Sequence, residues 1–348
     1  MNLERMKMIN KIFTAFFALL VTYSASAQQE SHYINLTNNP YLLNPAAGGM
    51  TSTFNVEATS RTQWLGYDGG PRTISIVGNS PVRFGKGEKV LKEYNPEGKA
   101  FYKAPERTTG SMKHVLGGMA MTDAIGPFNR TSVQASYSIH LPLIKSINIG
   151  AGLSIGWSNF RINQDRVTLY QADDPAYSQF LGSTSSQNIA NANAGIIFYN
   201  EELFVGISTS QLLRNAATFG GIETGSNYNR HYYFMAKYAF EAADKFQIEP
   251  TAVLKIAENS PMSLDAGARF IYNKSVWLGI QYRTTNALTF QLGANLIKNF
   301  YLAYGYEQGI GVIQLAGNST HEIQLGFYLG NNGTSKKELK IKDEKTEE

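Results

Sequence analysis

Residues 147–157 read INIGAGLSIGW, and every second residue of this stretch is apolar. The odd-numbered positions hold Ile, Ile, Ala, Leu, Ile and Trp, whereas the even-numbered positions hold only Asn, Gly and Ser. A period of two puts alternate side chains on opposite faces of a β-strand. The stretch therefore predicts a strand with one apolar face and one small, polar face. The same alternation returns in residues 133–140, 288–296 and 323–329.

Segments of this kind predict an all-β fold of about fourteen strands, each of roughly 9 to 14 residues, which suits tilted membrane-spanning strands. Connections after even-numbered strands are mostly short, whereas those after odd-numbered strands include the long segments 161–186 and 213–229. Short turns on one side and long loops on the other are typical of a transmembrane antiparallel β-barrel of the outer membrane. We place the strands near residues 53–61, 71–80, 114–123, 127–140, 146–160, 187–199, 202–212, 230–242, 245–257, 262–272, 275–284, 287–297, 299–308 and 319–330.

The polar faces of these strands favour a membrane barrel over a soluble β-sandwich. A soluble sandwich usually carries many Lys and Glu residues on its outer face, but here the polar face is mostly Gly, Ser, Asn and Gln. We interpret this face as the lining of a wet lumen and the apolar face as the surface toward outer-membrane lipid. A few isolated charges share the polar face, namely Lys237, Glu249, Lys255, Asp265, Arg269 and Arg283.

Composition excludes several classes of function. The 348 residues include no cysteine, which excludes disulfides, thiolate catalysis and iron–sulfur clusters. The net charge of +4 comes without a basic stripe on the predicted strands, so nucleic acid is not an expected partner. The five histidines are widely scattered, and no nucleotide-binding or hydrolase motif occurs. We therefore expect neither an enzyme nor a metal or cofactor site.

The chain divides into four predicted segments. Residues 1–27 have a basic start, a short apolar run and Ala-Ser-Ala at 25–27, as in a signal peptide. Residues 28–52 form an N-terminal segment, residues 53–330 the barrel, and residues 331–348 a charged tail that we expect to be disordered. The barrel includes a basic insertion at 81–113, which is either a solvated loop or a docking surface for a periplasmic partner.

Three motifs resemble the PorP/SprF family of the Bacteroidota type IX secretion system. They are NPYLLNPAAGG at 39–49, RTQWLGYDGGPRT at 61–73 and STHEI at 319–323. The resemblance implies an outer-membrane accessory to protein secretion. Its expected partners are type IX secretion components, a peptidoglycan-linked periplasmic protein and secreted cargo, which in some relatives includes gliding adhesins.

The motif residues are the candidate contacts with a partner or a plug. Residues 28–52 either enter the lumen as a plug or simply lead into the first strand. The second motif begins just past the first strand, in a connection that strand parity places outside the cell. It either binds a partner or fastens the loop to the barrel, with Arg61 meeting a luminal carboxylate. The candidates are Asn39, Pro40, Asn44, Pro45, Gly48, Arg61, Gln63, Trp64, Gly66, Pro71, His321 and Glu322.

Three functions fit these patterns to different degrees. The first is an accessory barrel that holds secretion or cargo proteins at the outer membrane. The alternative is an outer-membrane diffusion channel or a transporter of hydrophobic solutes. A soluble β-protein, such as a surface lectin, agrees least with the polar faces of the strands.

Overall fold

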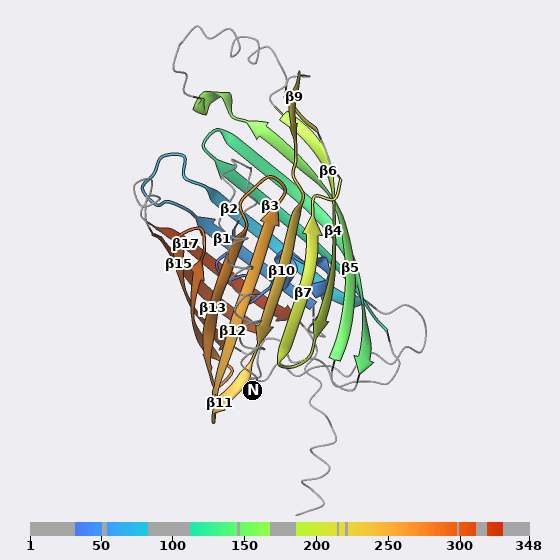
Figure 1. Cartoon of the computed structure of the whole chain (residues 1–348), viewed down its shortest axis with the longest axis vertical. Coiled ribbons are helices and arrows are strands. Elements are labelled where there is room, and N and C mark those ends of the chain that lie inside the picture. Colours follow the sequence, from blue (N-terminus) through green and yellow to red (C-terminus); the bar gives the residue numbers. More distant parts are fainter. Residues whose placement is uncertain are drawn as a thin grey trace, which may run out of the picture.

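The computed structural model describes nine segments, which together contain seventeen β-strands and three short 3-10 helices. Fifteen of the strands form one antiparallel sheet that closes into a barrel (Figure 1). Within these segments, no helix is long and apolar enough to cross a bilayer. The described residues are 32–50, 54–82, 112–144, 147–167, 186–213, 216–219, 222–297, 299–310 and 319–329.

The fifteen strands form fourteen positions around the barrel wall, because β11 continues the line of β10 after a break at Ala239. We call each of these positions a stave. Each neighbouring pair in the chain is antiparallel, β1 pairs with β17, and β10 pairs with both β7 and β12 to complete the ring. The predicted fold class is therefore confirmed. The staves are β1 (Phe54–Thr62), β2 (Arg72–Val82), β3 (Lys113–Ile125), β4 (Phe128–Ile144), β5 (Ile147–Ile162), β6 (Ser186–Tyr199), β7 (Leu203–Ser210), β10 (His231–Tyr238) with β11 (Phe240–Ala243), β12 (Phe246–Ala257), β13 (Ser263–Tyr272), β14 (Val276–Arg283), β15 (Ala287–Ile297), β16 (Phe300–Gly309) and β17 (Thr320–Leu329).

One connection carries structure that the alternation pattern did not predict. Within the expected loop 213–229, β8 (Ala216–Phe219) pairs with β9 (Ile222–Asn227) in a separate two-stranded sheet. These strands have four and six residues, which is too short to cross a membrane and too short for a clear period of two. The hairpin rises above the barrel near β6 (Figure 1).

The two faces of the staves differ as the alternation requires. In β5, Leu153 and Ile155 are 62% and 71% exposed, whereas the intervening Ser154 is 5% exposed. The outward side chains are large and apolar along the other strands too, for example Ile76, Ile207 and Leu278. A surface of this kind is stable only where lipid rather than water surrounds it.

The two ends of the barrel have different connections. We name the end that carries 63–71, 211–230 and 310–319 the loop end, and the opposite end the turn end. In Figure 1 the loop end is at the top, near β9, and the turn end is at the bottom, near β11. Residues 1–31, most of the basic insertion (83–111) and the tail from 330 onward lie outside the described residues.

Residues 32–50 lie inside the barrel, and we name them the plug. All but three of these nineteen residues are buried, and their hydrogen bonds run to inward-facing strand residues. The plug descends from His32, beside Lys255 near the loop end, to Gly49, beside Lys113 at the turn end. It includes the helical turns η1 (Pro40–Leu42) and η2 (Pro45–Ala47), and a third turn, η3 (Gln164–Arg166), follows β5.

A charge on the outward face of β5 tests the membrane assignment. We expect Ile155→Arg to lower the free energy of unfolding by about 2 to 4 kcal/mol, because Ile155 lies near the middle of its strand, where arginine meets hydrocarbon. Leu65→Arg is the control, since Leu65 is 56% exposed in the loop-end connection 63–71. Denaturant titration in lipid vesicles measures both variants, and equal stabilities would contradict the lipid-facing assignment.

Candidate functional site

Two asparagines set the local shape of the plug. The side chain of Asn39 accepts a hydrogen bond from the Tyr41 nitrogen at 3.1 Å, and that of Asn44 accepts from the Ala46 nitrogen at 2.9 Å. Each asparagine caps a 3-10 turn, and a proline follows it at the first helical position, where its missing N–H is not needed. The repeated Asn-Pro of the first motif therefore encodes two capped turns.

Glycines in the strands make room for the second turn. A Cβ at Gly152 of β5 would lie 2.5 Å from the backbone nitrogen of Ala46, and one at Gly195 of β6 would overlap the Asn44 amide. The Asn44 amide nitrogen in turn donates to the carbonyls of Ile196 and Ile207, at 3.3 and 3.1 Å. Small luminal residues thus let η2 approach the barrel wall closely.

Glu322 is the main anchor near the loop end. Its carboxylate is fully buried and accepts from the backbone nitrogens of Ile34 and Asn35, both at 2.8 Å, and from the Asn35 side chain at 3.1 Å. Hydrogen bonds to an ionised acceptor are stronger than those between neutral groups. The last strand of the barrel therefore holds the start of the plug.

The middle of the plug is bound by β17 again and by two more strands. Lys237 of β10 donates to the Thr37 carbonyl at 2.9 Å, and Asn38 donates to Gln324 of β17 at 2.7 Å. Arg269 of β13 donates to the side-chain oxygen of Asn38. Because the plug has no strand pairing of its own, these side chains satisfy backbone and amide groups that would otherwise be buried without partners.

The turn-end part of the plug is bound through the backbone of Gly48 and Gly49. The Gly48 carbonyl accepts from His140 Nε2 at 2.8 Å, and the Gly49 nitrogen donates to Asn79 at 2.7 Å. Lys113 donates to the Gly49 carbonyl. A Cβ at Gly49 would overlap Val115, and its φ of +72° also favours glycine.

The luminal charges are paired and buried, not isolated as the sequence suggested. A chain of ion pairs crosses the loop-end half of the barrel: Lys255 to Asp265 at 2.8 Å, Asp265 to Arg283 at 2.8 Å, Arg283 to Glu307 at 2.7 Å and Glu307 to Arg61 at 3.2 Å. A second group joins Glu249 to Arg269 at 2.5 Å and to Lys237 at 3.9 Å. The plug shields these charges from solvent, and a buried charge without a partner would be costly.

Arg61 lies within β1, so its expected position just past the first strand is wrong. It alternates with Glu57 and Thr59 on the inward face, is 1% exposed and meets the luminal carboxylate of Glu307. This ion pair joins β1 to β16 in the barrel wall. The pairing of β1 with β17 also sets Arg61 opposite Glu322 and thus joins the second and third motifs.

The rest of the second motif forms a compact connection at the loop end. Gln63 donates its backbone N–H to the Pro71 carbonyl at 2.8 Å, which closes the base of the connection. Trp64 and Gly66 both have positive φ, and the Trp64 ring meets that of Tyr67 edge-on. His321 borders the same end, with its ring nitrogens 2.6 Å from the Tyr304 hydroxyl and 3.0 Å from Ser319.

Apart from Arg61, the candidate residues fall into two sets. Asn39, Pro40, Asn44, Pro45 and Gly48 shape the plug, and Glu322 binds it, whereas Gln63, Trp64, Gly66, Pro71 and His321 shape the loop end. Neither His140 nor Lys113 was predicted to bind the plug. His140 ends the predicted strand 127–140, where a titratable side chain on an inward face was the available signal. Lys113 was assigned to the basic insertion 81–113, whereas the structure places it at the start of β3. Among the described residues, no three His, Asp or Glu side chains gather as a metal site.

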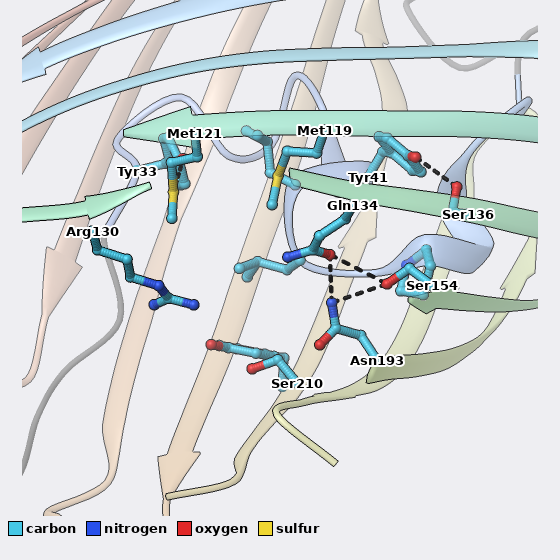
Figure 2. A pocket seen from close by; sticks show the side chains of 14 residues that line it. Tyr33, Tyr41, Met119, Met121, Arg130, Gln134, Ser136, Ser154, Asn193 and Ser210 are labelled. Carbon is cyan, nitrogen blue, oxygen red and sulfur yellow. Dashed lines mark hydrogen bonds between the residues drawn. The ribbon is translucent and has the colours of Figure 1, made fainter. Parts of the chain in front are cut away.

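A hollow of about 670 Å³ lies beside the plug, toward β3 to β6 (Figure 2). Tyr33, Met119 and Met121 form one side of it. On the opposite side, Asn193 donates to Gln134 at 2.7 Å and to Ser154 at 2.9 Å. The polar lining on that side is thus bonded to itself, which leaves few groups to orient a ligand.

The closed barrel, its apolar outer face and the anchored plug define an outer-membrane β-barrel protein. The family model described as "Type IX secretion system membrane protein PorP/SprF" matches residues 25–327. The chain therefore belongs to the PorP/SprF family of type IX secretion membrane proteins. Membership and fold together point to a non-enzymatic membrane component associated with the secretion machinery, or to a channel.

Several solved outer-membrane proteins share the general architecture at low identity. Omp33 of Acinetobacter baumannii is 9% identical with a TM-score of 0.44, over 81% of this chain and 100% of that chain. The toluene transporter TodX of Pseudomonas putida is 8% identical with a TM-score of 0.43, over 88% and 96% of the two chains. These structures are too distantly similar for the function of this chain to be inferred from them. No curated protein sequence matches the chain.

Removal of the Glu322 carboxylate tests its role as an anchor. We expect Glu322→Ala to lower the free energy of unfolding by about 3 kcal/mol or more, because hydrogen bonds to a charged group contribute about 1.5 to 3 kcal/mol each. Glu258→Ala is the control: Glu258 faces Arg230 at 3.6 Å and is 27% exposed, so its loss should cost less than about 1 kcal/mol. Similar losses in the two variants, measured by denaturant titration, would contradict the anchor.

Proposed function

We propose that this protein is an accessory barrel of type IX secretion, which holds partner proteins at the outer membrane and does not conduct solutes. The observation that supports this most is the plug: strands from around the barrel bind it along its length, and it occupies the lumen from one end to the other. A barrel whose interior is largely filled by its own chain offers its two ends, rather than its lumen, to other proteins.

The loop end supplies an apolar surface for such contacts. Leu65 and Tyr67 are each 56% exposed, and the positive φ of Trp64 and Gly66 fixes the connection that presents them. Exposed aromatic and aliphatic side chains on a rigid connection are typical of binding surfaces. We propose that this surface contacts a translocon component or secreted cargo, including gliding adhesins where these are exported.

The turn end is the proposed site for a peptidoglycan-linked periplasmic partner. Lys113 is the last residue of the basic insertion 81–113, and its ammonium group donates a hydrogen bond to the Gly49 carbonyl inside the barrel. The insertion therefore begins and ends beside the base of the plug. Residues 1–27 are proposed as the signal peptide and 331–348 as a periplasmic tail, with 53–330 as the barrel. These segments extend beyond the described residues.

Partner recovery tests the accessory role. Full-length tagged protein, gently solubilised from outer membranes, should retain type IX components or cargo, identified by mass spectrometry. Because Leu65 and Tyr67 form the proposed contact, Leu65→Ser with Tyr67→Ser should reduce recovery of the outer partner by about tenfold, the effect of roughly 1.4 kcal/mol. Ile310→Ser is the control, since Ile310 is 40% exposed elsewhere at the loop end. A barrel recovered without partners would contradict the proposal.

The alternative, a diffusion channel or transporter of hydrophobic solutes, predicts an open path in the native protein. Our proposal instead predicts little conductance for the native chain in planar bilayers and a clear rise for Gly152→Leu, because the new side chain would displace η2 from the wall. Ala151→Leu is the matched control, since Ala151 points outward on the same strand. Steady conductance by the native protein would favour the channel.

A further inference from the structure

A second hollow, of about 490 Å³, lies at the loop end between the plug and strands β10, β12 and β13. It meets the hollow of Figure 2 at Tyr33, Leu43 and Tyr233, which line both. We name it the loop-end hollow. The polar groups that line it differ from those of the hollow in Figure 2, which bond to one another.

Three polar side chains that line the loop-end hollow have no hydrogen-bond partner among the described residues. His231 is 7% exposed and Ser263 is 5% exposed, and both line the hollow. Within the described part of the chain, neither ring nitrogen of His231 forms a hydrogen bond, and neither does the hydroxyl of Ser263 or of Ser260. Buried polar groups are nearly always hydrogen-bonded, so several together on one wall indicate a place for a polar ligand group.

Lys255 adds a cationic donor to this wall. Its ammonium group donates to Asp265 at 2.8 Å and to His32 Nδ1 at 3.1 Å. An ammonium group has three donors, so one remains. Asp265 also pairs with Arg283, so its single negative charge is divided between two cations. It therefore does not fully neutralise Lys255.

The groups around His32 make the local electrostatic potential positive. Burial, and then the charges of Lys255, Arg283 and Arg61, lower the pKa of His32 well below its usual range. The ring is therefore neutral, and its Nδ1 accepts a hydrogen bond from the Lys255 ammonium group. Arg61 itself is 1% exposed, and its Nε and Nη1 have no partner among the described residues. The unsatisfied groups here are able to donate, so an acceptor-rich anion suits them.

The remaining walls are apolar and aromatic. Leu36 and Leu43 of the plug face the hollow, and the rings of Tyr33 and Tyr233 also line it. The ring of His231 stacks on that of Tyr233, with centroids 6.4 Å apart. Such walls bury an aliphatic or aromatic body, while the donors on the other wall hold one charged group.

We propose that the loop-end hollow binds a small organic monocarboxylate with an apolar body. The carboxylate lies against His231, Ser260, Ser263 and Lys255, and the body lies between the two tyrosines and the plug leucines. The site is reached from the loop end, and it does not depend on the proposed role in secretion.

Ligand binding to the purified full-length protein in a non-ionic detergent tests this site. The probes are phenylacetate and hexanoate, with phenylacetamide as the uncharged analogue of the first, and saturation-transfer NMR and calorimetry give the dissociation constants. We expect saturable binding of at least one carboxylate, at least about tenfold tighter than that of the amide, since charge-assisted hydrogen bonds are lost. No saturable binding of either carboxylate, or equal binding of phenylacetate and phenylacetamide, would overturn the proposal.

Two variants and a control locate the binding. His231→Phe keeps a ring of similar shape without its nitrogens, and Ser263→Ala removes only a hydroxyl, so each should weaken binding by about tenfold. His114→Phe makes the same ring exchange near the turn end, where His114 contacts the Tyr137 hydroxyl at 2.6 Å, and should leave binding unchanged. Heat-modifiable gel mobility checks that every variant is folded. Unchanged affinity in both folded loop-end variants would overturn the site.

Discussion

The structure depends on one constraint: an irregular segment lies inside a barrel, and its polar groups must find partners there. The plug has no strand neighbour, so inward-facing side chains take the place of sheet hydrogen bonds. Glu322 shows this most clearly, because one carboxylate accepts two backbone N–H groups and a side-chain amide of the plug. His140, Asn79 and Lys237 do the same for other parts of its backbone.

The luminal charges have two roles that support each other. They pair with one another around the wall, and several also bind the plug, so that Arg269 contacts both Glu249 and Asn38. The plug keeps water from the ion pairs, and the ion pairs hold the strands at the positions that the plug requires. A lumen arranged in this way suits a protein whose ends bind other proteins. It also leaves, near the loop end, a small hollow with unsatisfied donors.

Much of this architecture could be predicted from the sequence. The period-two pattern located all fourteen staves to within a few residues, because a lipid-facing strand must alternate whatever its neighbours are. It failed for the β8–β9 hairpin, whose strands are too short to cross a membrane or to show a period. The Asn-Pro pairs at 39–40 and 44–45 encode the two local turns. They do not indicate where in the molecule those turns lie.

The sequence by itself determined the class of fold, the lipid-facing residues and the family motifs, since each rests on local patterns. Only the tertiary structure decided which luminal charges meet and where the N-terminal segment lies. The physical reason is closure: β1 pairs with β17, which brings Arg61 opposite Glu322, and Glu322 then reaches Ile34, 288 residues away in the chain. Contacts of that range follow from the barrel as a whole, and no local pattern encodes them.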